Sequence, residues 1–130
     1  MRDEALTEVV IGCAFKVHNN LGEGFLENVY ENALAHELHK KDIRFTQQAP
    51  IQVIYDGKVV GDYYADLWVE ERVIVEIKDV QSLHKRHEVQ LVNYLTATGV
   101  DTGLLLNFGR SVQIKRKFRK HHEKTQDLQD

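Results

Sequence analysis

Cysteine is almost absent from this sequence of 130 residues, because Cys13 is the only one. A single cysteine excludes a disulfide within the chain and any zinc site built from several cysteines. Long apolar runs are also missing, since no stretch reaches the roughly eighteen residues of a membrane-spanning helix. The chain opens with Met1-Arg2-Asp3-Glu4 and continues into an amphipathic pattern, which is unlike a signal peptide. We therefore expect a soluble protein that acts in the cytoplasm.

What remains is the composition of a globular protein with a core. The chain is 42% hydrophobic, which suits one domain with a buried interior. No internal repeat or interdomain linker interrupts it. We predict a single domain over residues 1–120, followed by a polar tail over residues 121–130.

The net charge of −3 conceals an asymmetry along the chain. Residues 1–80 carry 8 basic and 15 acidic side chains, whereas residues 81–130 carry 9 basic and 5 acidic ones. A basic half of this kind can face a polyanion such as nucleic acid. The candidates for contacts with phosphate groups are Arg110, Lys115, Arg116, Lys117 and Arg119.

Hydrophobic periodicity predicts the order of the elements. The pattern indicates, in order, helices over about 3–20 and 25–40, strands over about 51–55, 59–69 and 73–78, a helix over about 82–98, and strands over 102–108 and 112–118. Because a helix joins the third strand to the fourth, we expect those two strands to be parallel neighbours. The fold class predicted is α/β, with a mixed sheet flanked by helices in the order ααβββαββ.

The most informative stretch is the predicted hairpin that ends at Lys78. Alternation along its second strand puts Glu76 and Lys78 on one face, and Asp66 of the preceding strand can lie beside them. One interpretation is a solvated sheet face with a surface Glu/Lys pair. The other is a Mg²⁺ site, in which Asp66 and Glu76 supply oxygen ligands and Lys78 acts on a water or a phosphate.

A second cluster lies on the helix that follows this strand. Gln90 falls within its predicted inward stripe, between His87 and Tyr94. A glutamine on an inward face needs hydrogen-bonding partners, which a purely structural network can supply. Because the helix directly follows the strand of Glu76 and Lys78, its first turns can instead lie near those two residues. Glu27, on the first turn of the second helix, has a simple alternative role in stabilising the helix dipole.

Several spaced motifs together resemble the GxxExxY family of small proteins, which belongs to the PD-(D/E)XK nuclease superfamily. The matching segments are Gly22-Glu23-Gly24-Phe25-Leu26-Glu27-Asn28-Val29-Tyr30, Asp66, Glu76-Ile77-Lys78, Gln90-Leu91-Val92-Asn93-Tyr94 and Asn107-Phe108-Gly109. The resemblance covers about residues 5–118 and implies a restriction-endonuclease-like core. One departure is Ala65, which stands where the superfamily motif has proline.

The resemblance also implies roles for individual residues. Asp66 and Glu76 take the places of the two motif acids, and Lys78 takes that of the lysine. Glu27 resembles the helical glutamate of the RecB-like branch and would be a further metal ligand, while Gln90 and Tyr94 match its QxxxY element. The activity implied is Mg²⁺- or Mn²⁺-dependent hydrolysis of phosphodiester bonds, in DNA in preference to RNA.

Two alternatives remain open. The first is a catalytically silent module on the same fold that binds nucleic acid or protein. The second is a zinc hydrolase that uses the histidine pair 84 and 87 or the pair 36 and 39, although no third ligand is evident. A homodimer through an exposed terminal strand and an unidentified protein partner are further expectations.

Overall fold

The structure is a computed structural model, and it describes residues 1–120. The elements within these residues are α1 (Asp3–Leu21), α2 (Glu27–Lys40), β1 (Phe45–Tyr55), β2 (Lys58–Val69), β3 (Val73–Lys78), α3 (Lys85–Thr98), β4 (Thr102–Phe108) and β5 (Val112–Phe118). The predicted polar tail lies outside the described residues. None of the helices in this part of the chain combines the length and the apolar character needed to cross a bilayer.

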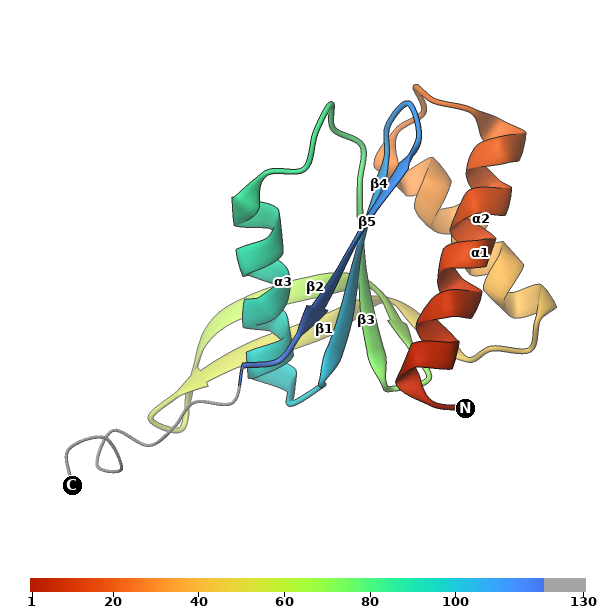
Figure 1. Cartoon of the computed structure of the whole chain (residues 1–130). Helices are drawn as coiled ribbons and strands as arrows, with labels where there is room; N and C mark the ends of the chain where they lie inside the picture. Colours follow the sequence, from red (N-terminus) through yellow and green to blue (C-terminus); the bar gives the residue numbers. More distant parts are fainter. Residues whose placement is uncertain (121–130) are drawn as a thin grey trace.

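The strands of the described chain form one mixed sheet in the order β1-β2-β3-β4-β5. Neighbouring strands are antiparallel except for β3 and β4, which are parallel. A parallel pair needs a crossover connection, and α3 provides it. Figure 1 shows α1 and α2 on one face of the sheet and α3 on the other. The predicted α/β fold with a mixed sheet and the order ααβββαββ is thus confirmed.

Alternation along β3 divides the core between the two faces of the sheet. Val75 and Ile77 face α1 and α2, whereas Ile74 packs with Leu91 and Leu95 of α3. Burying an aliphatic side chain of this size contributes about 1.5–3 kcal/mol to folding. Glu76 shares the α3 face with Ile74 and is only 6% exposed. A carboxyl group is therefore held in a region that otherwise favours apolar side chains.

The ribbon of β1 and β2 changes sides at Gln48. Residues two apart in a regular strand face the same way, yet Phe45 packs against the α1 and α2 core while Ala49 and Ile51 join the core on the α3 side. Gln48 has a φ of 52°, which is uncommon for a residue other than glycine. The ribbon extends past α3 after this twist (Figure 1).

The first strand begins earlier than its sequence pattern predicts. It starts at Phe45 and runs through Pro50, which was expected to precede it. Proline interrupts a strand only where its missing N–H is needed, and β1 is an edge strand with one unpaired side. The helix expected from about residue 82 likewise begins at Lys85, after His84 as its N-cap.

Candidate functional site

The site begins where β2 and β3 stop pairing. Their ladder extends from Val69↔Val73 to Leu67↔Val75 and then ends. Beyond it, the side chains of Asp66 and Glu76 take over the bonds that the strands no longer make. Glu76 Oε2 accepts the N–H of Asp66 at 2.8 Å. Asp66 Oδ2 accepts the N–H of Ile77 at 2.7 Å. These reciprocal bonds hold the two carboxyl groups side by side, and we call Asp66 and Glu76 the acid pair.

The acid pair is electrostatically strained. Burial, followed by the charge of Asp66, raises the pKa of Glu76 to about 8, although the charge of Lys78 acts in the opposite direction. Two carboxylates held side by side repel each other, and Glu76 is too deeply buried for water to screen their charges. At neutral pH the side chain of Glu76 therefore keeps its proton in the metal-free protein. A bound cation would favour the ionised form.

A third carboxyl group reaches the acid pair from α2. Glu31 is 7% exposed. Its Oε1 accepts a hydrogen bond from Gln48 Nε2 at 2.8 Å, and its Oε2 accepts one from Gln47 Nε2 at 2.6 Å. Gln48 Nε2 also lies 3.2 Å from Asp66 Oδ1. Burial raises the pKa of Glu31, and the charge of Asp66 adds to this effect. Gln48 therefore links the helix acid to the strand acid.

Glu31 was not predicted from the sequence, which pointed to Glu27 instead. Glu27 is the first residue of α2 and is exposed. Residues four apart share one face of a helix, so Glu27 lies one turn beyond Glu31 on the same side. That spacing is the signal that could have identified Glu31. The exposed position of Glu27 does not support the prediction that it is a metal ligand.

The glycine and tyrosine of the same motif have a structural role. Tyr30 is fully buried, and its hydroxyl donates to the carbonyl of Gly22 at 2.6 Å while accepting the N–H of Phe25 at 3.2 Å. Gly24 has a φ of 101°, where a side chain would be strained. These contacts fix the loop that leads into α2. Because Glu31 directly follows Tyr30, they also help to set the position of Glu31.

Lys78 ends β3 on the same face as Glu76, as predicted. It is half-buried. Its charge lowers the pKa of Glu76 and, after the larger effect of burial, that of His87 on α3. Lys78 therefore contributes positive charge to the surroundings of the acid pair.

Tyr94 and Gln90 approach the site from α3. Tyr94 is 6% exposed. Burial, followed by the charges of Glu76, Tyr63 and Asp66, raises its pKa to about 12. Its hydroxyl is therefore protonated and able to donate. The expectation that Gln90 is buried was wrong, because the inward stripe of α3 is formed by Leu91, Tyr94 and Leu95. Gln90 is exposed and lines an open groove beside Tyr94.

The predicted basic surface is divided between the two faces of the sheet. On β5, Lys115 and Lys117 face the α3 side, opposite Leu105 and Gly103. Arg116 faces the other side and pairs with Glu8 of α1. Two further ion pairs join Lys117 to Glu88 at 3.1 Å and Arg119 to Asp101 at 2.9 Å, and Arg110 lies exposed between β4 and β5. Glu76 is paired with Leu105 of β4, and Leu105 is paired with Lys115 of β5. Lys115 is thus the basic residue of this set that lies nearest to the acid pair in register.

The histidines that suggested zinc have another use. Nδ1 of His84 accepts the N–H of Arg86 at 3.1 Å, and Nδ1 of His87 accepts the N–H of His84 at 3.1 Å. Both rings therefore cap the N-terminus of α3. Among residues 1–120, no three His, Cys, Asp or Glu side chains are grouped as a ready metal-ligand set. The described chain therefore offers a cation a pair of acids, with Glu31 nearby but held by two glutamines.

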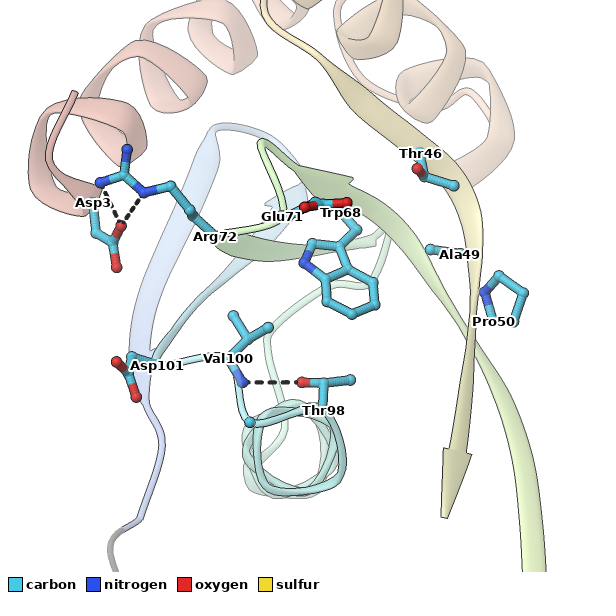
Figure 2. A pocket seen from close by; sticks show the side chains of 11 residues that line it. Asp3, Thr46, Ala49, Pro50, Trp68, Glu71, Arg72, Thr98, Val100 and Asp101 are labelled. Atoms are coloured by element: carbon cyan, nitrogen blue, oxygen red, sulfur yellow. Dashed lines mark hydrogen bonds and ion pairs between the residues drawn. The ribbon is translucent and has the colours of Figure 1, made fainter. Parts of the chain in front are cut away.

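A separate hollow of about 740 Å³ lies at the other end of α3. Figure 2 shows the indole of Trp68 projecting into it, with the ion pair of Asp3 and Arg72 at its edge. Trp68 Nε1 is buried and has no hydrogen-bond partner in the described part of the chain. None of the predicted site residues lines this hollow. This hollow is therefore separate from the acid pair and from the other predicted site residues.

Comparisons with known proteins give one family match and similarities to solved structures. A family model described as the PD-(D/E)XK nuclease superfamily matches residues 4–120. One similar solved structure is titled as that of SSO0001, with 17% identity, a TM-score of 0.57, and coverage of 73% of this chain and 50% of that chain. Another is an alkaline exonuclease (LHK-Exo) from Laribacter hongkongensis, with 14% identity, a TM-score of 0.53, and coverage of 72% and 56%.

These structural similarities are informative about the fold. Both identities are low, and the chain spans only about half the length of each of the two solved structures. No curated protein matches the chain.

Proposed function

The chain belongs to the PD-(D/E)XK nuclease superfamily, and from this premise we propose that it is a nuclease that hydrolyses phosphodiester bonds in DNA with the help of a divalent cation. The observation that carries the proposal is the hydrogen-bonded acid pair, in which Glu76 is buried, with Lys78 on the same face. Within the superfamily we assign the chain to the GxxExxY family and to the RecB-like branch, on the spacing of the motifs around Tyr30 and Tyr94.

The residues present fit a divalent cation. PD-(D/E)XK nucleases generally use such ions, and Mg²⁺ is commonly bound through one or two carboxylates while it keeps several waters. Asp66 and Glu76 would hold it, because burial and then the charge of Asp66 raise the pKa of Glu76, and a cation would favour the ionised form. Such an ion supplies a water of lowered pKa and polarises the phosphate. Glu31, bound by Gln47 and Gln48, would keep Asp66 in position.

The remaining side chains have roles toward the phosphate and the attacking water. Lys78 would orient that water and offset the negative charge that builds on the phosphate in the transition state. Tyr94, which keeps its proton, would donate a hydrogen bond to a phosphate oxygen or position Lys78. Gln90, one turn before Tyr94 on the same helix, would likewise position Lys78 or bind a phosphate oxygen. Lys115 would contact the nucleic-acid backbone on the same face of the sheet.

A catalytically silent binding module is the second candidate. It is favoured by the reciprocal bonds of the acid pair, which give both carboxyl groups a purely structural use. A module of this kind would bind nucleic acid or a protein partner without cleaving it. The test of the first candidate also decides this one.

We expect cleavage of DNA in the presence of Mg²⁺ or Mn²⁺ that stops on addition of EDTA and is at least about 100-fold slower in Asp66→Asn. Asp66→Asn removes an oxygen ligand and a charge at the acid pair. The matched control is Asp62→Asn on the same strand, since Asp62 is exposed. Single- and double-stranded DNA and RNA would be incubated with each protein and the products separated on gels.

Cleavage of equal rate in wild type and Asp66→Asn would assign the activity to another site or to a contaminant. Binding without cleavage in every combination of substrate and metal would favour the silent module. Loss of activity in Asp62→Asn as well would mean that the acid pair is not the specific requirement.

A second prediction concerns Gln48, whose amide links Glu31 and Asp66. Replacing it by glycine removes this link but suits the backbone, because glycine adopts a positive φ without strain. We expect Gln48→Gly to fold at least as stably as wild type and to cleave about 10- to 100-fold more slowly, as for other residues that orient metal ligands. Gln52→Ala, on the same strand, is the control. Full activity in Gln48→Gly would exclude a positioning role.

A further inference from the structure

A groove of about 600 Å³ lies between the β1 and β2 ribbon and α3. One wall is formed by the ribbon and the other by the side of α3 that carries the QxxxY element. The groove is lined by Val53, Ile54, Tyr63, Gln90, Asn93, Tyr94, Thr96 and Ala97. Its volume is within the range of sites that enclose a small molecule or a base.

Within residues 1–120, no residue that lines the groove is charged. Phosphate groups are held by Lys, Arg, backbone N–H groups or a cation, and the groove supplies none of the charged groups. It offers two tyrosine rings, aliphatic walls, and the amides of Gln90 and Asn93, both exposed on α3. Rings on which a flat group can stack, combined with amides that hydrogen-bond to its edge, are the features that recognise an unpaired nucleobase.

The ring of Tyr63 is held in place and yet accessible. It is 44% exposed, whereas Tyr94 is 6% exposed. The two ring centroids lie 5.5 Å apart with an interplanar angle of 45°. A Cβ added at Gly61 would lie 3.1 Å from Cε2 of Tyr63. The absence of a side chain at Gly61 therefore lets the ring lie over its own strand, where it forms a wall of the groove.

Two residues that line the groove lie near the acid pair. Tyr63 is three residues before Asp66 on β2, and Tyr94, which also lines the groove, packs in the core on the α3 side with Ala65, the residue next to Asp66. A nucleotide whose base lies in the groove would therefore have its phosphate near Asp66 and Glu76. Bases inside a duplex are stacked on their neighbours and cannot enter such a groove without being unpaired.

We propose that this groove is a subsite for an unpaired nucleobase, which stacks on Tyr63, and that the substrate is therefore single-stranded next to the bond that is cut. The inference rests on the proposed function, because it deepens the assignment of the same site. It identifies Tyr63 as a specificity-determining residue.

Binding of a fluorescein-labelled single-stranded oligothymidylate, measured by anisotropy in EDTA so that no cleavage occurs, tests the proposal. Tyr63→Ala is expected to weaken binding by about 5- to 150-fold, the range for loss of one stacked base. Tyr63→Phe keeps the ring and is expected to bind as wild type does. The matched control is Tyr64→Ala, since Tyr64 is 58% exposed on the next residue but does not line the groove.

Two further arms separate the base from the phosphate and the ring position from the fold. An oligonucleotide that lacks its bases should bind wild type and Tyr63→Ala equally, because nothing remains to stack. Gly61→Ala should weaken binding of the intact oligonucleotide, since its methyl group displaces the ring. Circular dichroism would show that each variant is folded.

Equal binding by Tyr63→Ala and Tyr64→Ala, or an effect of Tyr63→Ala that persists without bases, would overturn the proposal. So would absence of binding combined with self-association of the wild type that Tyr63→Ala abolishes, which would make the ribbon an interface between copies of the chain. Because binding is measured without cleavage, these outcomes leave the test with Asp66→Asn unaffected, and the two proposals can fail separately.

Discussion

Replacing Lys78 by alanine is expected to lower the rate of cleavage by about 100- to 10,000-fold while changing the affinity for single-stranded DNA much less. The lysine shares a face with Glu76 and is half-buried beside the acid pair. In the proposed mechanism its ammonium group acts mainly where negative charge develops, so most of its effect would belong to the transition state. Single-turnover cleavage and anisotropy binding, measured on the same preparation, give the two quantities.

Lys115 supplies the matched control for this result. It is a lysine on the same face of the sheet, but Leu105 of β4 separates it from Glu76 in register. Lys115→Ala should weaken binding and reduce its dependence on salt, because one phosphate contact is lost, while cleavage at saturating DNA continues. If Lys78→Ala instead weakened binding and left single-turnover cleavage intact, the lysine would be a phosphate contact, and a silent binding module would fit the chain better.

The largest expected effect on stability comes from Glu76. The pKa of its side chain is about 8 in the folded protein against 4.5 for an unperturbed glutamate. Between these values the folded protein holds a proton that the unfolded chain has released, so the free energy of unfolding of the metal-free protein should fall as pH rises from about 4.5 to 8. The total loss is on the order of a few kcal/mol, because each pKa unit corresponds to about 1.4 kcal/mol.

Glu76→Gln isolates this contribution. It keeps a hydrogen-bond acceptor for the N–H of Asp66 but cannot ionise. We expect the variant to be more stable than wild type at pH 8 in EDTA, and to lose less stability between pH 5 and 8, as measured by urea unfolding. Glu71→Gln, in the exposed turn between β2 and β3, is the control. If the free energy of unfolding depended on pH equally in wild type and Glu76→Gln, Glu76 would not be the source of the pH dependence.

Mn²⁺ gives a second measurement on the same proteins. It should raise the melting temperature of wild type at pH 8 and have little effect on Glu76→Gln, because the ion replaces the proton and relieves the repulsion between the carboxylates. A shift of the same size in both proteins would place the binding of the ion elsewhere.

The acid pair could be predicted because its members are close in the sequence. Asp66 and Glu76 are ten residues apart on two consecutive strands, and alternation alone decides which side chains share a face. The same argument correctly placed Lys78. The parallel pairing of β3 and β4 also followed from the helix between them.

Glu31 and Gln48 were missed for a different reason. Their contact joins a helix to an edge strand seventeen residues later, and it depends on the positive φ of Gln48, which no sequence pattern announces in a glutamine. The twist at Gln48 also moves Tyr63 to the α3 side, where the groove forms. Periodicity treats a strand as regular, so a change of face within the strand lies beyond what it can predict.

The basic residues show the same limit on β5. A run of positive charge suggested one surface, but the side chains of a strand alternate between its faces. The acids that pair with these residues, Glu8, Glu88 and Asp101, also lie at least 18 residues away in the sequence. The charges of such a run are therefore divided between faces and partly neutralised by the rest of the chain.

The reciprocal bonds of the acid pair have a consequence for how this sequence can change over time. Each carboxyl group satisfies a backbone N–H where the ladder between β2 and β3 ends, so loss of either acceptor would leave a donor without a partner. A relative without nuclease activity would still be selected to keep an acceptor at positions 66 and 76. Among residues 1–120, the ammonium group of Lys78 has no hydrogen bond to a backbone group. Among relatives of this chain that lack nuclease activity, position 78 should therefore vary before positions 66 and 76 do. A lysine at position 78 should distinguish active relatives better than the acids at positions 66 and 76.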